Sequence, residues 1–181
     1  MTIAAVSLAG PVPGDAALPR SIATGFEEAF RGEERRLFGI AFSILRDPLE
    51  AEEALQETSV QAWRSWGQLA DPARTGAWLT TICVRSCLAR RRRLARVRRR
   101  SAVAHPELVA ATDHLLYDGR YIDLDRAYRA LSTRQRAVIT LHYQHGHPLP
   151  ACAAIMGCSP GSAASHLSRA LTKLRRELGD A

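Results

Sequence analysis

The chain is short of lysine, of long apolar runs and of strand-like patterns. Lys173 is its only lysine, although lysine and arginine together number 25. No uninterrupted apolar stretch approaches the roughly 18 residues that a membrane-spanning helix needs. We find no alternation of apolar and polar residues of the kind that predicts a half-buried strand. These absences argue against a membrane protein and predict an all-α chain of one or two small domains.

Sequence motifs for catalysis and metal binding are missing as well. There is no glycine-rich phosphate loop, no nucleophile elbow and no carboxylate pair with a base. Five residues with zinc-ligand chemistry lie close in sequence, but their spacing matches no standard zinc pattern: His142, His145, His147, Cys152 and Cys158. We therefore expect no enzymatic activity of its own, no metal and no cofactor.

The N-terminal segment lacks the features of a targeting signal. It has no basic start, and glycine and proline at Gly10, Pro11, Pro13 and Gly14 interrupt it, so it is a poor signal peptide. We expect residues 1–20 to form a disordered leader and the protein to be cytoplasmic. Its four cysteines should then be reduced.

Arginine is abundant and concentrated in one stretch, Ala77–Arg100. Nine arginines and no acidic residue lie between Arg85 and Arg100, in a chain whose net charge is +7. Without those nine, 16 basic residues would face 18 acidic ones. A block of like charge is unfavourable unless a polyanion neutralises it, so this patch predicts nucleic-acid binding. A solvated, charged helix end is the simpler alternative, and genomic base composition would equally explain the preference for arginine over lysine.

Apolar periodicity predicts helices throughout the first half, residues 21–100. The first helix spans Ile22–Arg46. Asp47-Pro48-Leu49-Glu50 predicts the N-cap and capping box of a second helix that reaches about Trp66. Its inward face should comprise Ala51, Ala54, Leu55, Thr58, Ala62 and Trp63, and its other face is acidic, with Glu52, Glu53 and Glu57. Another helix starts at Asp71-Pro72 and leads into the arginine stretch.

A change of composition at residues 101–122 predicts a linker to a second domain, residues 123–181. Ser132 and Gln135 form a capping box there. A short apolar helix, the turn Gly157-Cys158-Ser159 and a capped helix to about Leu178 follow one another in the order of a helix-turn-helix. The N-terminal turns of such a second helix reach base edges in the major groove of DNA.

Four stretches resemble the extracytoplasmic-function sigma factors of the sigma-70 family. They are AEEALQETSVQAWRSW (51–66), RTGAWLTTIC (74–83), LSTRQRAVITLHY (131–143) and GCSPGSAASHLSRALTKLRREL (157–178). With Phe26–Arg46, the resemblance covers most of residues 22–178. It implies a chain that binds core RNA polymerase and directs it to promoters. The first domain would engage and open the minus-ten element, and the second would read the minus-thirty-five element as duplex. An anti-sigma factor is a further expected partner.

The resemblance also implies residue roles. Glu53, Gln56 and Glu57 would contact the coiled coil of the largest polymerase subunit. Trp63 and Trp78 are expected in the core, whereas Trp66 would lie against an unstacked base. The residues expected at minus-ten DNA are Arg64, Trp66, Arg85, Arg90, Arg91, Arg92 and Arg93. Those expected at minus-thirty-five DNA are Arg134, Ser162, Ser165, His166, Ser168, Arg169 and Lys173.

The sequence departs from the family pattern in both DNA-binding regions. The family usually has an Arg-Asn pair and an Asp four residues after that Asn. At these three positions this chain has Val84, Arg85 and Ala89. Before the turn, Ala151-Cys152 replaces the usual Glu-Ile. In the reading helix, Ser-Ala-Ala-Ser-His (162–166) replaces Thr-Val-Lys-Ser-Arg, so two basic side chains are missing. We expect altered minus-ten recognition and weaker or different minus-thirty-five contacts.

Two other functions fit parts of the sequence. A repressor or activator would use the helix-turn-helix with the first half as a dimerisation module, but it has no use for the acidic face at Glu53, Gln56 and Glu57. An interaction protein would use the arginine run to bind RNA or acidic partners without sequence preference.

Overall fold

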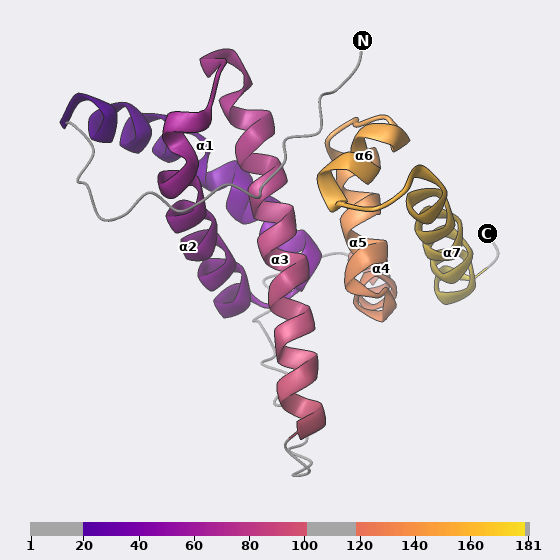
Figure 1. Cartoon of the computed structure of the whole chain (residues 1–181). Coiled ribbons are helices and arrows are strands. Elements are labelled where there is room, and N and C mark those ends of the chain that lie inside the picture. The colour runs from indigo at the N-terminus through magenta and orange to yellow at the C-terminus, as the bar shows by residue number, and fades with distance from the viewer. Residues whose placement is uncertain (1–19, 101–118, 180–181) are drawn as a thin grey trace.

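The computed structural model describes residues 20–100 and 119–179 (Figure 1). Within these ranges the chain is helical and contains no strand, which confirms the all-α prediction. No helix among the described residues is long and apolar enough to cross a bilayer. Nearly all of the expected leader, 1–20, and most of the expected linker, 101–122, lie outside the described residues.

The first half is a three-helix bundle. Asp47 caps the second helix by accepting a hydrogen bond from the Glu50 amide, 3.0 Å away. The expected capping box is nevertheless wrong in its second part, because the Glu50 carboxylate accepts from Arg90 instead. The predicted inward face is confirmed, with Trp63 only partly buried. The elements are α1 (Arg20–Leu45), α2 (Pro48–Ser65), two 3₁₀ turns, η1 (Trp66–Gln68) and η2 (Pro72–Arg74), and α3 (Thr75–Arg100).

The second half contains the expected helix-turn-helix. Ser132 and Gln135 form both hydrogen bonds of the predicted capping box. Gly157 ends the short helix in the left-handed region, with φ of 64°, which glycine adopts without steric cost. Ser159 then caps the last helix. The elements are α4 (Gly119–Ala130), α5 (Thr133–Ile139), a π-helical turn η3 (Thr140–Gln144), α6 (Leu149–Met156) and α7 (Pro160–Leu178).

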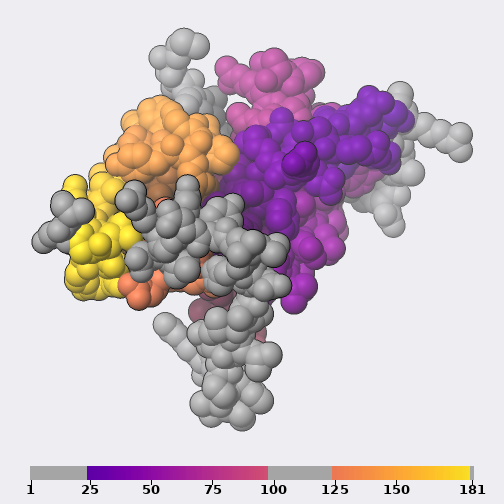
Figure 2. Space-filling view, turned by 180° about the vertical axis from the view of Figure 1, so that it is seen from behind, coloured from indigo at the N-terminus to yellow at the C-terminus, as the bar shows by residue number. Residues whose placement is uncertain are grey.

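One hydrophobic core joins the two halves. Helix α1 packs against α5, and α3 packs against α6 (Figure 1). Figure 2 shows the surfaces of the two halves meeting on the opposite side of the molecule. Leu37, Ile40 and Leu79 of the first half belong to the same buried cluster as apolar side chains of the second half, namely Ala137, Val138, Leu141, Cys152, Ile155 and Met156. Burial of this apolar surface favours a closed arrangement.

Three arginines add polar contacts across the same boundary. Buried Arg136 donates from Nε to the Ile44 carbonyl oxygen at 2.6 Å. Arg85 donates to the carbonyl oxygens of Ala154 and Ile155 at 3.0 and 3.2 Å. Arg46, which ends α1 with φ of 59°, forms an ion pair with Asp125. Each contact satisfies a backbone or carboxylate acceptor at the boundary, so the halves are held by directional bonds as well as by burial.

Candidate nucleic-acid and protein-binding surfaces

The acidic face of α2 lies against the start of the arginine run. Arg90, whose side chain is only 12% exposed, forms ion pairs with Glu50, Glu53 and Glu57. Its Nε lies 2.5 Å from Glu50, and its Nη1 lies 3.0 Å from Glu57. Arg93 forms a second ion pair with Glu57. Residues expected to bind a protein and residues expected to bind DNA thus contact each other.

Only part of this acidic face remains available to a partner. Gln56 is exposed, and the side chain of Glu53 is 55% exposed despite its ion pair. Glu57 is 29% exposed and is shared by two arginines. Leu49 and Val60 are exposed on the same helix, at 70% and 50%. Residues 49, 53, 56 and 60 follow helical spacing, so they form one outward stripe with apolar ends and a polar centre.

The arginine run divides into inward and outward side chains. Arg85 and Arg90 are engaged within the protein, as described above, and Arg91 is half-buried near Arg136. Arg92, Arg93 and Arg96 are exposed. Arg92 lines a hollow that faces the second half, Arg93 is paired with Glu57, and Arg96 lies farther along α3. Arg92 and Arg96 form no ion pair with the described acidic residues, so they can reach phosphates without breaking one.

Trp66 lies in an aromatic cluster beside the end of α2. Its ring centroid is 5.4 Å from that of Phe26 and 6.0 Å from that of Trp78. Trp63 also contacts Phe26, with its centroid 5.3 Å away. Trp66 is only partly buried, and the neighbouring Arg64 is exposed. The cluster orients Trp66 by packing, while its role at DNA stays a prediction.

The N-terminal turns of the reading helix α7 present small polar side chains and little charge. Ser162, Ser168 and Arg169 are exposed, whereas Ser165 and His166 are half-buried. The pKa of His166 is lowered, first by partial burial and then by the positive charges of Arg134 and Arg169. Lys173, also expected at DNA, donates instead to the Ala130 carbonyl oxygen and ties α7 to the end of α4.

Arg136 is the important side chain that the sequence patterns missed. Besides Ile44, its guanidinium donates to the carbonyl oxygens of Leu131 and Arg129, at 2.8 and 3.4 Å. Burial lowers its pKa to about 10, and the charge of Arg91 contributes. One signal was present in the sequence, because Arg136 precedes the inward residues Ala137 and Val138 and follows the N-cap by one turn. A charged residue there is unusual unless backbone acceptors surround it.

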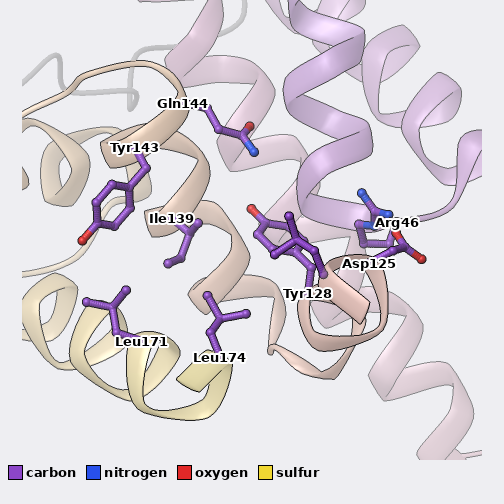
Figure 3. Close-up of a pocket in the computed structure, with 9 residues that line it drawn as sticks. Arg46, Asp125, Tyr128, Ile139, Tyr143, Gln144, Leu171 and Leu174 are labelled. Atoms are coloured by element: carbon purple, nitrogen blue, oxygen red, sulfur yellow. Dashed lines mark ion pairs between the residues drawn. The ribbon is translucent and has the colours of Figure 1, made fainter. Parts of the chain in front are cut away.

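An apolar groove of about 600 Å³ opens beside the second half (Figure 3). Ile139, Tyr143, Leu171 and Leu174 line one side, and Tyr128 with the Arg46–Asp125 ion pair lines the other. Leu124 is 46% exposed and lies at this groove. Tyr143, which lies in the π-helical turn, is 59% exposed. Such a surface suits a partner rather than the polar backbone of DNA.

The histidine and cysteine cluster shows local structural contacts. His142 Nδ1 lies 2.8 Å from the His147 carbonyl oxygen, which also accepts from the Cys152 thiol. The pKa values of His145 and His147 are lowered, first by burial and then by the charge of Arg36. Among residues 20–100 and 119–179, no three His, Cys, Asp or Glu side chains converge on a common point.

Comparison with known proteins accounts for both halves. The profile described as Sigma-70 region 2 matches residues 29–97, and the one described as Sigma-70, region 4 matches residues 121–174. The chain is 30% identical over 159 residues to the ECF RNA polymerase sigma factor SigM of Mycobacterium tuberculosis, covering 85% of this chain and 77% of SigM. The chain belongs to the extracytoplasmic-function sigma factors.

Other sigma factors show the same extent of similarity. The RNA polymerase sigma-E factor of Streptomyces avermitilis is 29% identical over 158 residues, which cover 84% of each chain. Two solved structures, each 24% identical in sequence, share the fold. RpoE of Bartonella quintana, solved with the anti-sigma factor NepR, has a TM-score of 0.61 and covers 88% of this chain and 98% of its own. CnrH, solved with the cytosolic domain of CnrY, has a TM-score of 0.53 and covers 88% and 93%.

The family regions coincide with the surfaces described above. Region 2 contains the outward stripe of α2 and most of the arginine run of α3, and region 4 contains the helix-turn-helix. A sigma factor needs a polymerase-binding surface and a promoter-binding surface in one chain. A helix-turn-helix regulator needs only the promoter-binding surface. That function is not favoured, because a region 2 match precedes the region 4 match in the same chain.

Proposed function

We propose that this sigma factor binds core RNA polymerase through the outward stripe of α2 and directs initiation from promoters recognised by α3 and α7. The observation that carries the proposal is the occurrence of both sigma-70 regions in one chain, each on the expected helices. Catalysis belongs to the polymerase, and we place the protein in the cytoplasm, where core polymerase works. An anti-sigma factor is a further expected partner, and the apolar groove of Figure 3 is a suitable surface for it.

At the polymerase, the stripe offers acceptors between two apolar contacts. The carboxylate of Glu53 and the amide of Gln56 would receive hydrogen bonds from basic residues of the partner, and Leu49 and Val60 would bury apolar surface at the ends. Glu57 would act mainly by holding Arg90 and Arg93 in place. The single positive charge of Arg90 is shared by three carboxylates on one helix face and reduces the repulsion among them.

At the promoter, the two halves would divide affinity and sequence reading. The exposed arginines of α3 with Arg64 and Trp66 would contact the opened minus-ten region, where phosphate contacts and stacking tolerate many sequences. Ser162, Ser165, His166 and Arg169 would approach base edges and phosphates of the minus-thirty-five duplex. Residues 21–100 and 123–181 serve as the two binding units, with residues 101–122 between them.

Simultaneous contact with both promoter elements requires the halves to separate. The two elements lie about 25 base pairs apart, which corresponds to about 85 Å of duplex. The longest helices that the structure describes, α1 and α3, have 26 residues each and are about 39 Å long. A molecule whose halves share one core therefore cannot span both elements. Opening would free Arg85 from the carbonyl oxygens of Ala154 and Ile155 and expose it for DNA.

Run-off transcription with purified core polymerase tests the proposal. Genomic fragments should yield discrete transcripts only when the sigma factor is added. A folded chain that binds the fragments but gives no specific transcript would leave the helix-turn-helix regulator as the better account. Binding of RNA and DNA without sequence preference would favour the interaction protein.

A further inference from the structure

A second hollow, of about 400 Å³, lies at the boundary between the halves. Its first-half side includes Gln61 of α2 and Arg85, Ser86 and Arg92 of α3. Its second-half side includes Arg134 at the start of α5 and Gly157 in the turn of the helix-turn-helix. Helix α3 runs beside α5 and α6 here (Figure 1), so the hollow exists only while the halves are packed together.

The lining of this hollow is strongly basic. Three arginines contribute to it, and no acidic residue does. Arg85 uses two of its N–H groups on the carbonyl oxygens of α6. Arg92 and Arg134 form no ion pair with any acidic residue in the described part of the chain. Like charges gathered in one hollow disfavour each other, and an anion bound between them would reverse this cost.

Ser86 adds an independent feature. Its side chain is 1% exposed and lines the hollow, yet its hydroxyl has no hydrogen-bond partner among the described residues. A buried hydroxyl is normally satisfied, because an unmade hydrogen bond in the interior costs free energy. The hydroxyl oxygen itself has almost no accessible surface, so a small movement of the lining would let a ligand oxygen in the hollow supply the missing partner.

We propose that this hollow binds a small polyphosphate, either an inorganic polyphosphate or the phosphate chain of a nucleotide. Guanidinium groups hold phosphate oxygens in forked, charge-assisted pairs, and a serine hydroxyl donates to the same oxygens. A volume of about 400 Å³ falls within the usual range of small-molecule sites, about 300–1,000 Å³. Duplex DNA, whose major groove alone is about 12 Å wide, is too large for it.

The ligand would oppose promoter binding. It would bridge α3 and the start of α5, and so stabilise the closed arrangement, while occupying arginines that promoter DNA requires. The ligand would bind the polymerase-free protein. Its binding depends on the residues that line the hollow and not on the proposed contacts with polymerase.

Isothermal titration of the full chain with sodium tripolyphosphate, at near-physiological salt, provides the first test. Wild type should bind one equivalent. The variant Arg92→Gln/Arg134→Gln should bind about tenfold more weakly, because two charge-assisted contacts are lost. The control Arg96→Gln/Arg175→Gln removes the same charge from exposed positions outside the hollow, and its affinity should stay within about twofold of wild type. Equal weakening of both variants, or several equivalents bound, would show general attraction to the arginine run and overturn the proposal.

Ser86→Ala provides a second test in which charge is unchanged. It should weaken tripolyphosphate binding by about fivefold, the effect of one hydrogen bond. In the absence of ligand it should raise the melting temperature, because an unpartnered buried hydroxyl has been removed. A purely structural serine cannot produce these opposite effects. Unchanged affinity for tripolyphosphate in Ser86→Ala would contradict the site.

The melting temperature and a nucleotide titration complete the test. Tripolyphosphate should raise the melting temperature of wild type but not that of Arg92→Gln/Arg134→Gln, since a ligand stabilises only the form that binds it. Adenosine triphosphate identifies the source: tighter binding than tripolyphosphate indicates a nucleotide, and equal binding indicates the phosphate chain alone. Failure of both compounds to bind wild type would refute the proposal, while run-off transcription would remain a separate test of the sigma-factor function.

Discussion

The two halves of this sigma factor distribute their arginines differently between the interior and the surface. The first half has an excess of them, and some turn inward, with Arg90 held by three carboxylates and Arg85 by backbone carbonyls. The second half has few on its reading helix, and its most buried arginine, Arg136, contacts the first half. In both halves, the arginines bonded to carboxylates or to backbone carbonyls serve packing, and the exposed ones without such bonds remain available for phosphate. A charge count alone therefore overestimates the DNA-binding surface of the first half.

The largest expected effect follows from removing the buried guanidinium group of Arg136. Arg136→Met would leave the buried carbonyl oxygens of Ile44 and Leu131 without donors. We expect a loss of about 3 kcal/mol in the free energy of unfolding, measured by urea denaturation. The matched change Arg134→Met, at a half-buried position two residues away, should cost well under about 1 kcal/mol. Similar losses in both variants would mean that the Arg136 bonds contribute little.

The next effect concerns the polar centre, Glu53 and Gln56, of the outward stripe of α2. Glu53→Arg/Gln56→Arg should weaken association with core polymerase by about 100-fold, because it places positive charge where acceptors are expected. The comparison is with Glu27→Arg/Glu28→Gln, which makes the same charge change at exposed positions of α1. Both variants should keep their helical circular dichroism. If the two variants bind core polymerase equally well, the stripe is not the contact surface.

A smaller effect separates inward from outward arginines within α3. Arg92→Ala should reduce the salt dependence of promoter affinity by about 0.9 in log–log slope, as one phosphate contact is lost. Arg90→Ala should leave this slope unchanged but lower stability by about 1 kcal/mol, because Glu50, Glu53 and Glu57 lose their shared cation. The slopes of the two variants are obtained from promoter binding measured by fluorescence anisotropy over a series of salt concentrations. An equal reduction of the slope in Arg90→Ala would show that Arg90 leaves the carboxylates for DNA.

The smallest effect concerns His166 in the reading helix. Its pKa in the free protein is below the usual 6.5, for the reasons given above, so it is neutral at pH 7. A DNA phosphate would raise this pKa, and binding would then take up a proton. Affinity for the minus-thirty-five duplex should therefore rise by about threefold as pH falls from about 8 to 6. His166→Ala should lose this dependence, and His166→Arg should bind more tightly at pH 8.

The full chain is the right material for the His166 measurement. The second half cut at Asp123 would expose apolar side chains that pack on the first half, including Val138, Leu141 and Ile155. His142, His145 and His147 are present in wild type and in both variants, so their titration cancels in the comparison. An identical pH dependence in wild type and His166→Ala would exclude a phosphate contact by this histidine.

Local structure was predictable because its causes are local. The caps at Asp47, Ser132 and Ser159 each accept a hydrogen bond from the amide three residues farther on, and the left-handed turn at Gly157 depends on its own backbone. The inward face of α2 follows from helical spacing. One local prediction was wrong in part, at Glu50, because a distant arginine competed successfully for its carboxylate.

The candidate surfaces were predictable only as residue types on helix faces. Spacing placed Glu53, Gln56 and the arginines of α3 on polar faces, and the family resemblance supplied their roles. Neither the spacing nor the resemblance could distinguish Arg90 from Arg92, which are two residues apart in one basic run. That distinction depends on which side of α3 faces α2, and the charges alone do not specify it.

The sequence by itself thus determined the all-α class, the helix caps, the helix-turn-helix and membership in the family. The tertiary structure decided which arginines are occupied, that both halves share one core, and that Ser86, Arg92 and Arg134 meet at one hollow. The physical reason is range. Capping and periodicity act within a turn or two of helix, whereas the pairing of Arg136 with Ile44 joins residues 92 positions apart, and only the packing of whole helices brings them together.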